Sequence, residues 1–445
     1  MIKIKSKNPD FFSVIQKNPQ YLEGIYPMRI KKGIALGMIN IEKNEYNALF
    51  QDTKYSYAED MSNQIDFQSF CSARLVLDVL TEGFNSALKS LVEYNSQKTP
   101  WLGEGKTVGD IDIPHDCSIE FFAYIDSNWV NKEGGGIFTK YFEEVAIEHI
   151  KGKAFKIKIS GNMTIYRLLN MTALICMFIT VINPQRWAIT ESLIEKYIRI
   201  MDNIGDVPYF IVYLFKVRLL YHDAYFDAYK GDLERIIGGN VKLSFGNTHD
   251  ARLGYICNQI DGKIPVLDVG CGEFLYAKRI MKKMGEGAIY YANDLEDWHT
   301  VANAINSRYK PTLLFSQDLD ELIKKIGNKQ VDIILTEVVE HNDEQAAREL
   351  ILKLLNKLNI RKFILTTVNK DFNVHYELEN DTRHEDHKFE MHMDEFTSFF
   401  DEILDSLKRK YDLEAFEYIQ IGDSLGDEAP TQGILYVKPD NFMNN

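Results

Sequence analysis

The carboxy-terminal half of the sequence predicts an α/β fold with a mostly parallel sheet and helices on both faces. Two observations support this. Short apolar runs at 264–269, 288–294, 331–335 and 362–367 alternate with helical patterns at 274–281, 298–307, 342–358 and 393–410. The first run also ends in a Gly-x-Gly turn that leads into a helix. Such alternation is typical of strands joined by helical crossovers. A last apolar run at 433–437 predicts an edge strand.

The amino-terminal half has a different texture and predicts a separate α+β domain. Apolar runs at 33–41, 73–80, 119–125 and 154–160 are divided by turn residues, and the glycines at 134–136 indicate a loop. From about 162 to 237 the pattern is helical, as in 189–201, where apolar residues recur three and four apart. A Gly- and Asn-rich stretch at 238–248 then suggests a linker. We therefore expect domains at 1–240 and 249–445.

Composition sets the class of protein. The chain has 445 residues, of which 45% are hydrophobic, and this length predicts two or three domains. Five scattered cysteines without a CxxC pair speak against a disulfide framework and a thiolate zinc cage. The most apolar run, 171–182, is too short to cross a bilayer, and no apolar signal core follows the first residues. We expect a cytoplasmic protein without a membrane segment.

Negative charge is concentrated in the carboxy-terminal half. The net charge is −14, with 28 basic and 30 acidic residues up to position 250 but 23 and 35 after it. Such a half would repel a polyphosphate along its length, which disfavours a broad nucleic-acid groove there. Binding only the end of a strand remains compatible with this charge.

The Gly-x-Gly turn, with Asp268, Gly270 and Gly272, predicts a nucleotide-like cofactor. Glycines without a Cβ let a ligand approach the backbone, but the third glycine of the dinucleotide motif is missing. Asp294 ends the second strand, where an acid binds ribose hydroxyls, and Asp318 ends the third, beside the expected adenine edge. This pattern resembles class I S-adenosylmethionine methyltransferases and implies that cofactor.

A candidate metal site follows the fourth strand. Glu337, Glu340 and His341 stand at offsets of zero, three and four, which would place them on one face of a helical turn. His384 and His387 follow 43 and 46 residues after His341 and offer further ligands. These oxygen and nitrogen donors suit Mn²⁺ or Mg²⁺, although Zn²⁺ or Co²⁺ would also bind by affinity. The HExxH pattern of metallohydrolases is absent from this segment.

The last 200 residues resemble the family that methylates the 2′-oxygen of the 3′-terminal nucleotide of small RNAs. The resemblance lies in four segments that occur in the same order, 337–341, 366–369, 372–373 and 383–390. The resemblance implies a manganese or magnesium ion held by Glu337, Glu340, His341 and His387. It also matches an arginine, Arg252, before the first strand, and the segment 429–432. Phe274 departs from the glycine that the family prefers.

The amino-terminal half resembles that of the bacterial RNA-repair members of this family. The similarity lies in 8–19 and 66–88. It implies an extra domain that partners a polynucleotide kinase-phosphatase with RNA-ligase activity.

The residues also suggest a mechanism. An ion with open positions can take the neighbouring 2′- and 3′-hydroxyls of a terminal ribose, which only an RNA 3′ end leaves free, and lower the pKa of the 2′-hydroxyl. Either His341 or His384 would accept the proton. We assign the RNA end to residues around the metal motif and to the arginine matched by the family: Asn369, Asn373, Arg383 and Arg252.

Two other functions fit the same residues. One is a metal-independent methyltransferase for a small molecule, in which the histidines form a structural network. The other is an inactive scaffold that docks a repair kinase-phosphatase-ligase, for which Phe274 is the best support. A measurement of metal content would distinguish the small-molecule enzyme from an RNA methyltransferase. A titration with S-adenosylmethionine would distinguish the inactive scaffold from an active enzyme.

Overall fold

The computed structural model describes residues 2–8, 23–30, 33–40, 45–52, 72–83, 113–125, 141–183, 189–376, 382–407 and 410–439. The chain divides into two compact units, Met1–Leu220 with Asp227–Ile237, and Tyr221–Phe226 with Gly238–Asn445. The loop expected at 134–136 lies outside the described residues.

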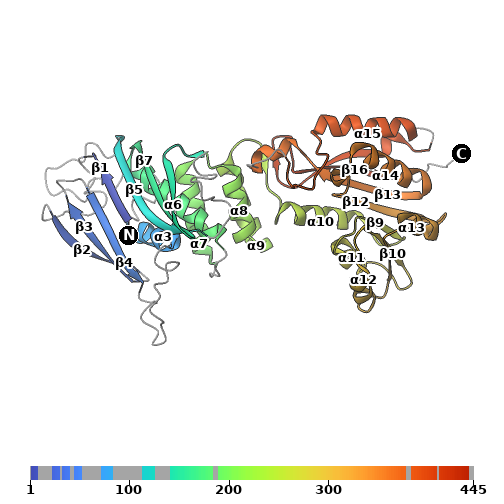
Figure 1. Cartoon of the computed structure of the whole chain (residues 1–445), viewed down its shortest axis with the longest axis horizontal. Coiled ribbons are helices and arrows are strands. Elements are labelled where there is room, and N and C mark those ends of the chain that lie inside the picture. Colours follow the sequence, from blue (N-terminus) through green and yellow to red (C-terminus); the bar gives the residue numbers. More distant parts are fainter. Residues whose placement is uncertain are drawn as a thin grey trace. The chain divides into compact units, whose positions relative to one another are not determined.

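An antiparallel sheet forms the framework of the amino-terminal unit (Figure 1). Within the described residues its strand order is β2-β3-β4-β1-β5-β7-β6. The strands are β1 (Ile2–Ser6), β2 (Glu23–Ile30), β3 (Gly33–Asn40), β4 (Glu45–Asp52), β5 (His115–Tyr124), β6 (Val145–Lys151) and β7 (Ala154–Met163). In β5, Cys117, Ile119 and Phe121 are buried, whereas Ser118 and Glu120 between them are partly exposed. One face of β5 therefore packs on a core, and its other face is partly open.

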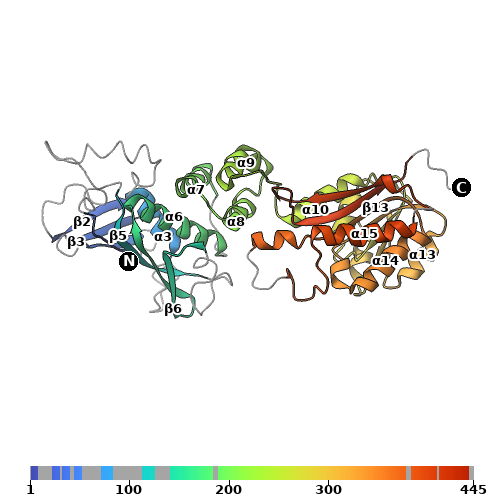
Figure 2. The same ribbon diagram turned by 90° about the horizontal axis from the view of Figure 1, so that it is seen from above.

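Two helices, α3 (Ala73–Gly83) and α6 (Ile165–Ile182), pack on the apolar face of this sheet (Figures 1 and 2). The helices α7 (Glu191–Ile204) and α8 (Tyr209–Leu219) pack on α6, and α9 (Asp223–Ile237) follows them in the chain. The helix α6 contacts β5, β7, α3, α7 and α8. Among described residues it alone is long and apolar enough to cross a membrane, but 94% of that segment is buried inside the protein. A helix that is apolar all round and enclosed by protein is a core helix.

The carboxy-terminal unit contains the expected mostly parallel sheet, with described strands in the order β11-β10-β9-β12-β13-β16-β14. The strands β9 (Val266–Val269), β10 (Ile289–Asn293), β11 (Thr312–Ser316), β12 (Gln330–Thr336) and β13 (Asn359–Val368) are parallel. The strand β16 (Thr431–Val437) runs antiparallel to β13 and to β14 (Phe416–Ile421). This architecture confirms the class I methyltransferase fold.

The prediction that 433–437 is an edge strand is wrong. The strand β16 lies between β13 and β14, and its first six residues are all buried. A continuous apolar run is typical of such an interior strand. The edge is β14, whose exposed residues interrupt the apolar ones and which the sequence pattern did not reveal.

Helices cover both faces of this sheet. One face carries α10 (Thr248–Gln259), α11 (Leu275–Ile280) and α12 (His299–Asn306), and the other carries α13 (Leu319–Ile326), α14 (Glu344–Lys357) and α15 (Met393–Leu407), seen in Figure 2. Neighbouring strand residues alternate between two cores. Val266 and Ile334 enter the first, and Leu267 and Ile333 enter the second. The apolar runs are continuous because both faces are buried.

The parallel strands end at one edge of the sheet. Gly270, Asp294, Asp318, Glu337 and Asn369 each lie one or two residues beyond the end of a parallel strand. Ligands of open α/β sheets bind outside these carboxyl ends. The topology therefore gathers most of the candidate residues at this edge.

At the opposite edge an arginine compensates a buried carboxylate. Arg361, on β13, hydrogen-bonds the fully buried Asp332 on β12 and forms a bidentate pair with Asp261, at 2.7 and 3.0 Å. Burial raises the pKa of Asp332, and Arg361 opposes that shift. The same guanidinium lowers the pKa of Asp261 to about 2.

We expect Arg361→Met to destabilise this unit by about 3–5 kcal/mol, because Asp332 would be left as an unpaired charge inside the protein. Denaturant unfolding of the full chain measures the loss. Lys353→Met is the matched control, since Lys353 pairs with Asp320 at the surface and should change stability little. Equal losses in the two variants would contradict the role given to Arg361.

Candidate active site

A glycine turn follows β9 and forms the first half of the site. Gly270 has φ 74°, and a Cβ on it would lie 2.3 Å from Cγ2 of Val338, so no larger residue fits. A Cβ on Gly272 would meet no described atom within 4 Å. The Gly272 N–H donates to Oδ2 of Asp294 at 2.8 Å, which ties the turn to the end of β10. The turn thus leaves open backbone at the carboxyl edge.

Asp268 lies beneath this turn and is fully buried. Its Oδ2 accepts the hydroxyl of Tyr290 at 2.8 Å, while Oδ1 has no hydrogen-bond partner among the described residues. Burial raises the pKa of Asp268 to about 7. An unsatisfied acceptor beneath open glycine backbone fits a ligand that brings a hydrogen-bond donor.

The acids after β10 and β11 come to the same edge. Asp294 accepts the N–H groups of Gly272 and Glu296. Asp318 is exposed and caps α13 by accepting the Asp320 N–H at 2.9 Å. Next to Asp294, Leu295 is 88% exposed, a large apolar side chain that sequence reasoning missed. The sequence signal that could have revealed it is an apolar residue directly after the acid that ends the strand.

Phe274, which stands at a glycine position of the resembling family, has a left-handed backbone with φ 60°. This conformation explains the preference for glycine, since a side chain there costs roughly 1–2 kcal/mol. The ring is fully buried and packs edge to face on Phe315 at 5.9 Å. The core therefore accommodates the departure, and Phe274 no longer favours an inactive scaffold.

The second half of the site follows β12. The expected helical turn over 337–341 is wrong at Glu337, because the short helix η3 contains only Val339–His341 and Glu337 has a left-handed φ of 53°. The Glu337 carboxylate lies 2.7 Å from the Arg252 guanidinium and accepts the Thr366 hydroxyl at 3.2 Å. Its carboxylate is thus engaged by Arg252 and Thr366, and it is not among the three residues whose ligand atoms lie within 4.8 Å of one another.

Glu340, His341 and His387 do converge, with one ligand atom from each within 4.8 Å of the others. Main-chain bonds hold the two distant stretches together, because the carbonyl of Glu340 accepts the N–H groups of Lys388 and Phe389 at 2.8 and 3.2 Å. The structure brings together three of the four predicted metal ligands. Glu337 is the exception. His384 is exposed, with its ring 5.3 Å from that of His387.

The environment of Glu340 fits a cation. The side chain is 0% exposed, and Oε2 accepts the Thr367 hydroxyl at 2.9 Å. Its Oε1 is buried without a hydrogen bond from any other described residue. Burial, and next the neighbouring Glu337 carboxylate, raise the pKa of Glu340 well above its ordinary value. A divalent ion would compensate a buried carboxylate that protein donors leave half satisfied.

Two carboxylates orient the histidine ligands. Glu390 meets Nδ1 of His387 at 2.5 Å, and Asp386 meets Nδ1 of His341 at 3.2 Å. A carboxylate on one ring nitrogen leaves the other for a metal. Burial alone would raise the pKa of Glu390, but hydrogen bonds from the Arg383 N–H and His387 hold the pKa below its usual value. Sequence reasoning missed these supporting roles although both acids lie inside 383–390.

The residues assigned to RNA lie around this site but are mostly engaged within the protein. Arg252, Asn369 and Asn373 are buried. Arg383 donates to the Asn373 side chain at 2.7 Å and the Asn369 carbonyl at 2.8 Å, and its guanidinium lies 5.1 Å from the Tyr376 ring centroid. In this arrangement they hold the frame of the site, and their contact with RNA stays a prediction.

Comparison with known proteins agrees with this architecture. Residues 1–237 match the family model described as the Hen1 N-terminal domain. A chain of the solved structure "Structure of the Pnkp1/Rnl/Hen1 RNA repair complex" is similar with a TM-score of 0.82 and 31% identity, over 98% of this chain and 100% of that one. A chain of "Structure of Pnkp1/Rnl/Hen1 complex" gives a TM-score of 0.80 and 31% identity with the same coverage.

A curated relative is the "Small RNA 2'-O-methyltransferase" of the nematode Caenorhabditis elegans. It is 30% identical over 153 residues, which cover 30% of this chain and 35% of the relative. The match thus spans about a third of that relative's length.

Replacing Asp268 should raise stability at high pH. The folded-state pKa of about 7 exceeds the ordinary value of 3.8, so the folded protein binds the proton more tightly and loses stability as pH rises from about 4 to about 7. We expect Asp268→Asn to add about 1–4 kcal/mol at pH 8 and little at pH 4. Denaturant unfolding across this range tests it. Asp261→Asn, which removes a carboxylate of lowered pKa, should instead lose stability at neutral pH.

Proposed function

Because the Hen1 N-terminal model covers more than half of it, the chain belongs to the Hen1 family, and we propose that it methylates the 2′-hydroxyl of the 3′-terminal nucleotide of RNA. The carboxy-terminal unit is a class I methyltransferase domain, with S-adenosylmethionine as the methyl donor that this fold uses. The observation that carries the proposal is the convergence of Glu340, His341 and His387 at the carboxyl edge of its sheet.

The contact between the two halves of the site supports this reaction. Val338 precedes Glu340 by two residues, and its Cγ2 approaches the Gly270 backbone so closely that a Cβ there would clash. The candidate cofactor turn and the candidate metal turn are therefore packed on each other. A methyl donor on one and a hydroxyl on the other would meet at short range, which is the main requirement of a group transfer.

The named relatives support RNA as the substrate and repair as the setting. One similar chain belongs to a Pnkp1/Rnl/Hen1 RNA repair complex, and the match covers 98% of the present chain. We therefore propose that this protein works with a kinase-phosphatase-ligase partner through its amino-terminal unit. The nematode relative, named for the 2′-oxygen, supports the position of methylation.

The ligand set suits Mn²⁺ or Mg²⁺, with Glu340, His341 and His387 as holders and Glu337 as the proposed fourth ligand. When bound, such an ion would activate the 2′-hydroxyl as a Lewis acid and would also coordinate the neighbouring 3′-hydroxyl. Glu340 brings a carboxylate oxygen with no other hydrogen-bond partner in the described structure. Asp386 and Glu390 hold the histidine rings in place for that purpose.

The proton of the 2′-hydroxyl needs an acceptor, and the geometry favours His384 over His341. His341 would use one nitrogen as a ligand and the other toward Asp386, so neither would remain to accept a proton. His384 is exposed beside His387 and forms no ion pair with the described residues. Its ring could thus reach a terminal ribose from the solvent side.

Methyl transfer should require the terminal 2′-hydroxyl. With labelled S-adenosylmethionine and Mn²⁺, we expect the full chain to label an RNA that ends in ribose but not the same RNA with a 2′-deoxy end. Glu340→Ala should lower the rate at least about a hundredfold and leave S-adenosylmethionine affinity nearly unchanged. Glu344→Ala, on the exposed side of α14, is the matched control. Labelling of both RNAs would refute the proposal.

Glu390 should act through His387. We expect Glu390→Gln to raise the Mn²⁺ concentration for half-maximal activity about 10- to 100-fold, because the ring loses its orienting charge. The maximal rate at saturating Mn²⁺ should recover. Glu395→Gln should leave the Mn²⁺ requirement unchanged, because Glu395 is exposed and, among the described residues, its carboxylate accepts the His392 N–H. A loss that excess Mn²⁺ cannot restore would contradict a positioning role.

A further inference from the structure

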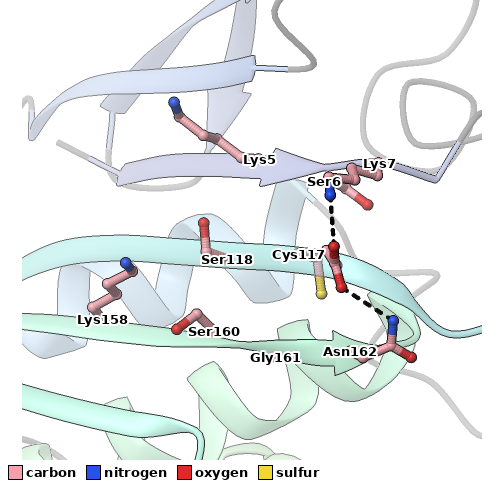
Figure 3. Close-up of a pocket in the computed structure, with 10 residues that line it drawn as sticks. Lys5, Ser6, Lys7, Cys117, Ser118, Lys158, Ser160, Gly161 and Asn162 are labelled. Carbon is pink, nitrogen blue, oxygen red and sulfur yellow. Dashed lines mark hydrogen bonds and ion pairs between the residues drawn. The ribbon is translucent and has the colours of Figure 1, made fainter.

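A groove crosses the open face of the amino-terminal sheet, away from the helices (Figure 3). It has a volume of about 580 Å³ and is formed by β1, β5 and β7. We call it the β1–β5–β7 groove. It is lined by Lys5, Ser6, Lys7, Asp116, Cys117, Ser118, Lys158, Ser160, Gly161 and Asn162.

Strand register sets the side chains of this groove in rows. Lys5 on β1 is opposite Ser118 on β5, which is opposite Ser160 on β7. Two residues along, Glu120 lies opposite Lys158. Because side chains alternate between faces, successive rows on the open face are about 6.7 Å apart. The groove thus repeats polar groups at a regular interval along the strands.

The centre of the groove is short of partners. No described residue hydrogen-bonds the hydroxyls of Ser118 and Ser160, and Figure 3 shows them projecting from neighbouring strands. The Lys158 ammonium forms no ion pair with the described residues. At one end, Asp116 accepts hydrogen bonds from Lys7 at 2.7 Å and from Asn162 at 3.2 Å. The donors near the centre are therefore available to a ligand.

Charge indicates what that ligand is. Three lysines and one aspartate line the groove, in a chain whose net charge is −14. Lys5 is paired with Glu45 at 2.5 Å and Lys7 with Asp116 at 2.7 Å, whereas Lys158, which has Glu120 opposite it on β5, forms no ion pair with the described residues. Lysine and hydroxyl donors are the groups that proteins offer to phosphate oxygens. The Lys158 ammonium and the two serine hydroxyls, which have no ion pair or hydrogen bond with the described residues, are donors that suit a phosphate group.

We propose that the β1–β5–β7 groove binds the sugar-phosphate backbone of single-stranded RNA, without reading its sequence. The inference rests on the proposed function, because an enzyme that takes only the last nucleotide needs another place for the strand, and the half with the methyltransferase site is strongly acidic. The same sheet face continues to Phe122, which is 37% exposed and offers a base a stacking surface. That feature favours RNA over an acidic peptide.

The test measures binding apart from catalysis. Fluorescence anisotropy of the full chain with a labelled single-stranded RNA, whose last sugar is 2′-deoxy, is recorded over a range of salt without S-adenosylmethionine or metal. We expect the double variant Lys5→Gln/Lys158→Gln to bind about tenfold more weakly and to reduce the salt slope by about 1.4, which is 0.7 for each lost phosphate contact. Ser118→Ala/Ser160→Ala should weaken binding severalfold and keep the slope, because it removes no charge.

Lys151→Gln/Lys230→Gln is the matched control, since it removes the same charge from the same unit outside the groove. It should leave affinity and slope unchanged, and thermal unfolding of each variant reports its folding. Unchanged RNA binding in both groove variants would overturn the inference, as would equal losses in the control. Weakened binding of polyglutamate but not of RNA would also overturn it, in favour of an acidic protein ligand. Because this RNA cannot accept a methyl group, none of these results depends on the proposed reaction.

Discussion

The site depends on two main-chain hydrogen bonds, those from the N–H groups of Lys388 and Phe389 to the carbonyl of Glu340. They join a turn after β12 to a segment more than forty residues later, and side chains alone would not hold such a distance in register. Backbone groups must find partners when buried, so this pairing also stabilises the loop. His387 approaches Glu340 and His341 because this backbone contact exists.

Buried negative charge is the second constraint. Asp268 and Glu340 are both fully buried at the carboxyl edge, and each keeps one oxygen without a described partner from another residue. Each such atom is costly in the ligand-free protein. An interior evolved for stability alone would satisfy or remove them. Because these oxygens lie beside the glycine turn and the histidines, we infer that bound ligands supply their missing partners. The ligand-free protein is then less stable than it could be, at the place where ligands bind.

Much of the methyltransferase domain could be predicted from the sequence because its signals are local. The alternation of apolar runs with helical patterns gave β9, β10, β12 and β13, and the glycine turn placed the cofactor edge. The failures involve long-range contacts. Nothing in residues 337–341 signals the left-handed backbone of Glu337 or the contacts of its carboxylate with Arg252 and Thr366, which come from other parts of the chain. Likewise, the apolar run at 433–437 does not indicate which strands will lie beside it in the sheet.

The proposed RNA groove and the acidic methyltransferase unit would place two tasks in different parts of the chain. Binding a terminal ribose by its hydroxyls and a metal requires contacts at atomic range, and at physiological ionic strength a charge is largely screened beyond roughly 8 Å. Acidic residues elsewhere on that unit therefore oppose the last nucleotide little, while they repel a strand laid along the surface. A chain that reads only the end of an RNA can keep such a surface, because it discourages binding to internal nucleotides. Backbone binding then needs lysines and hydroxyls elsewhere, as in the row of Lys5, Ser118 and Ser160.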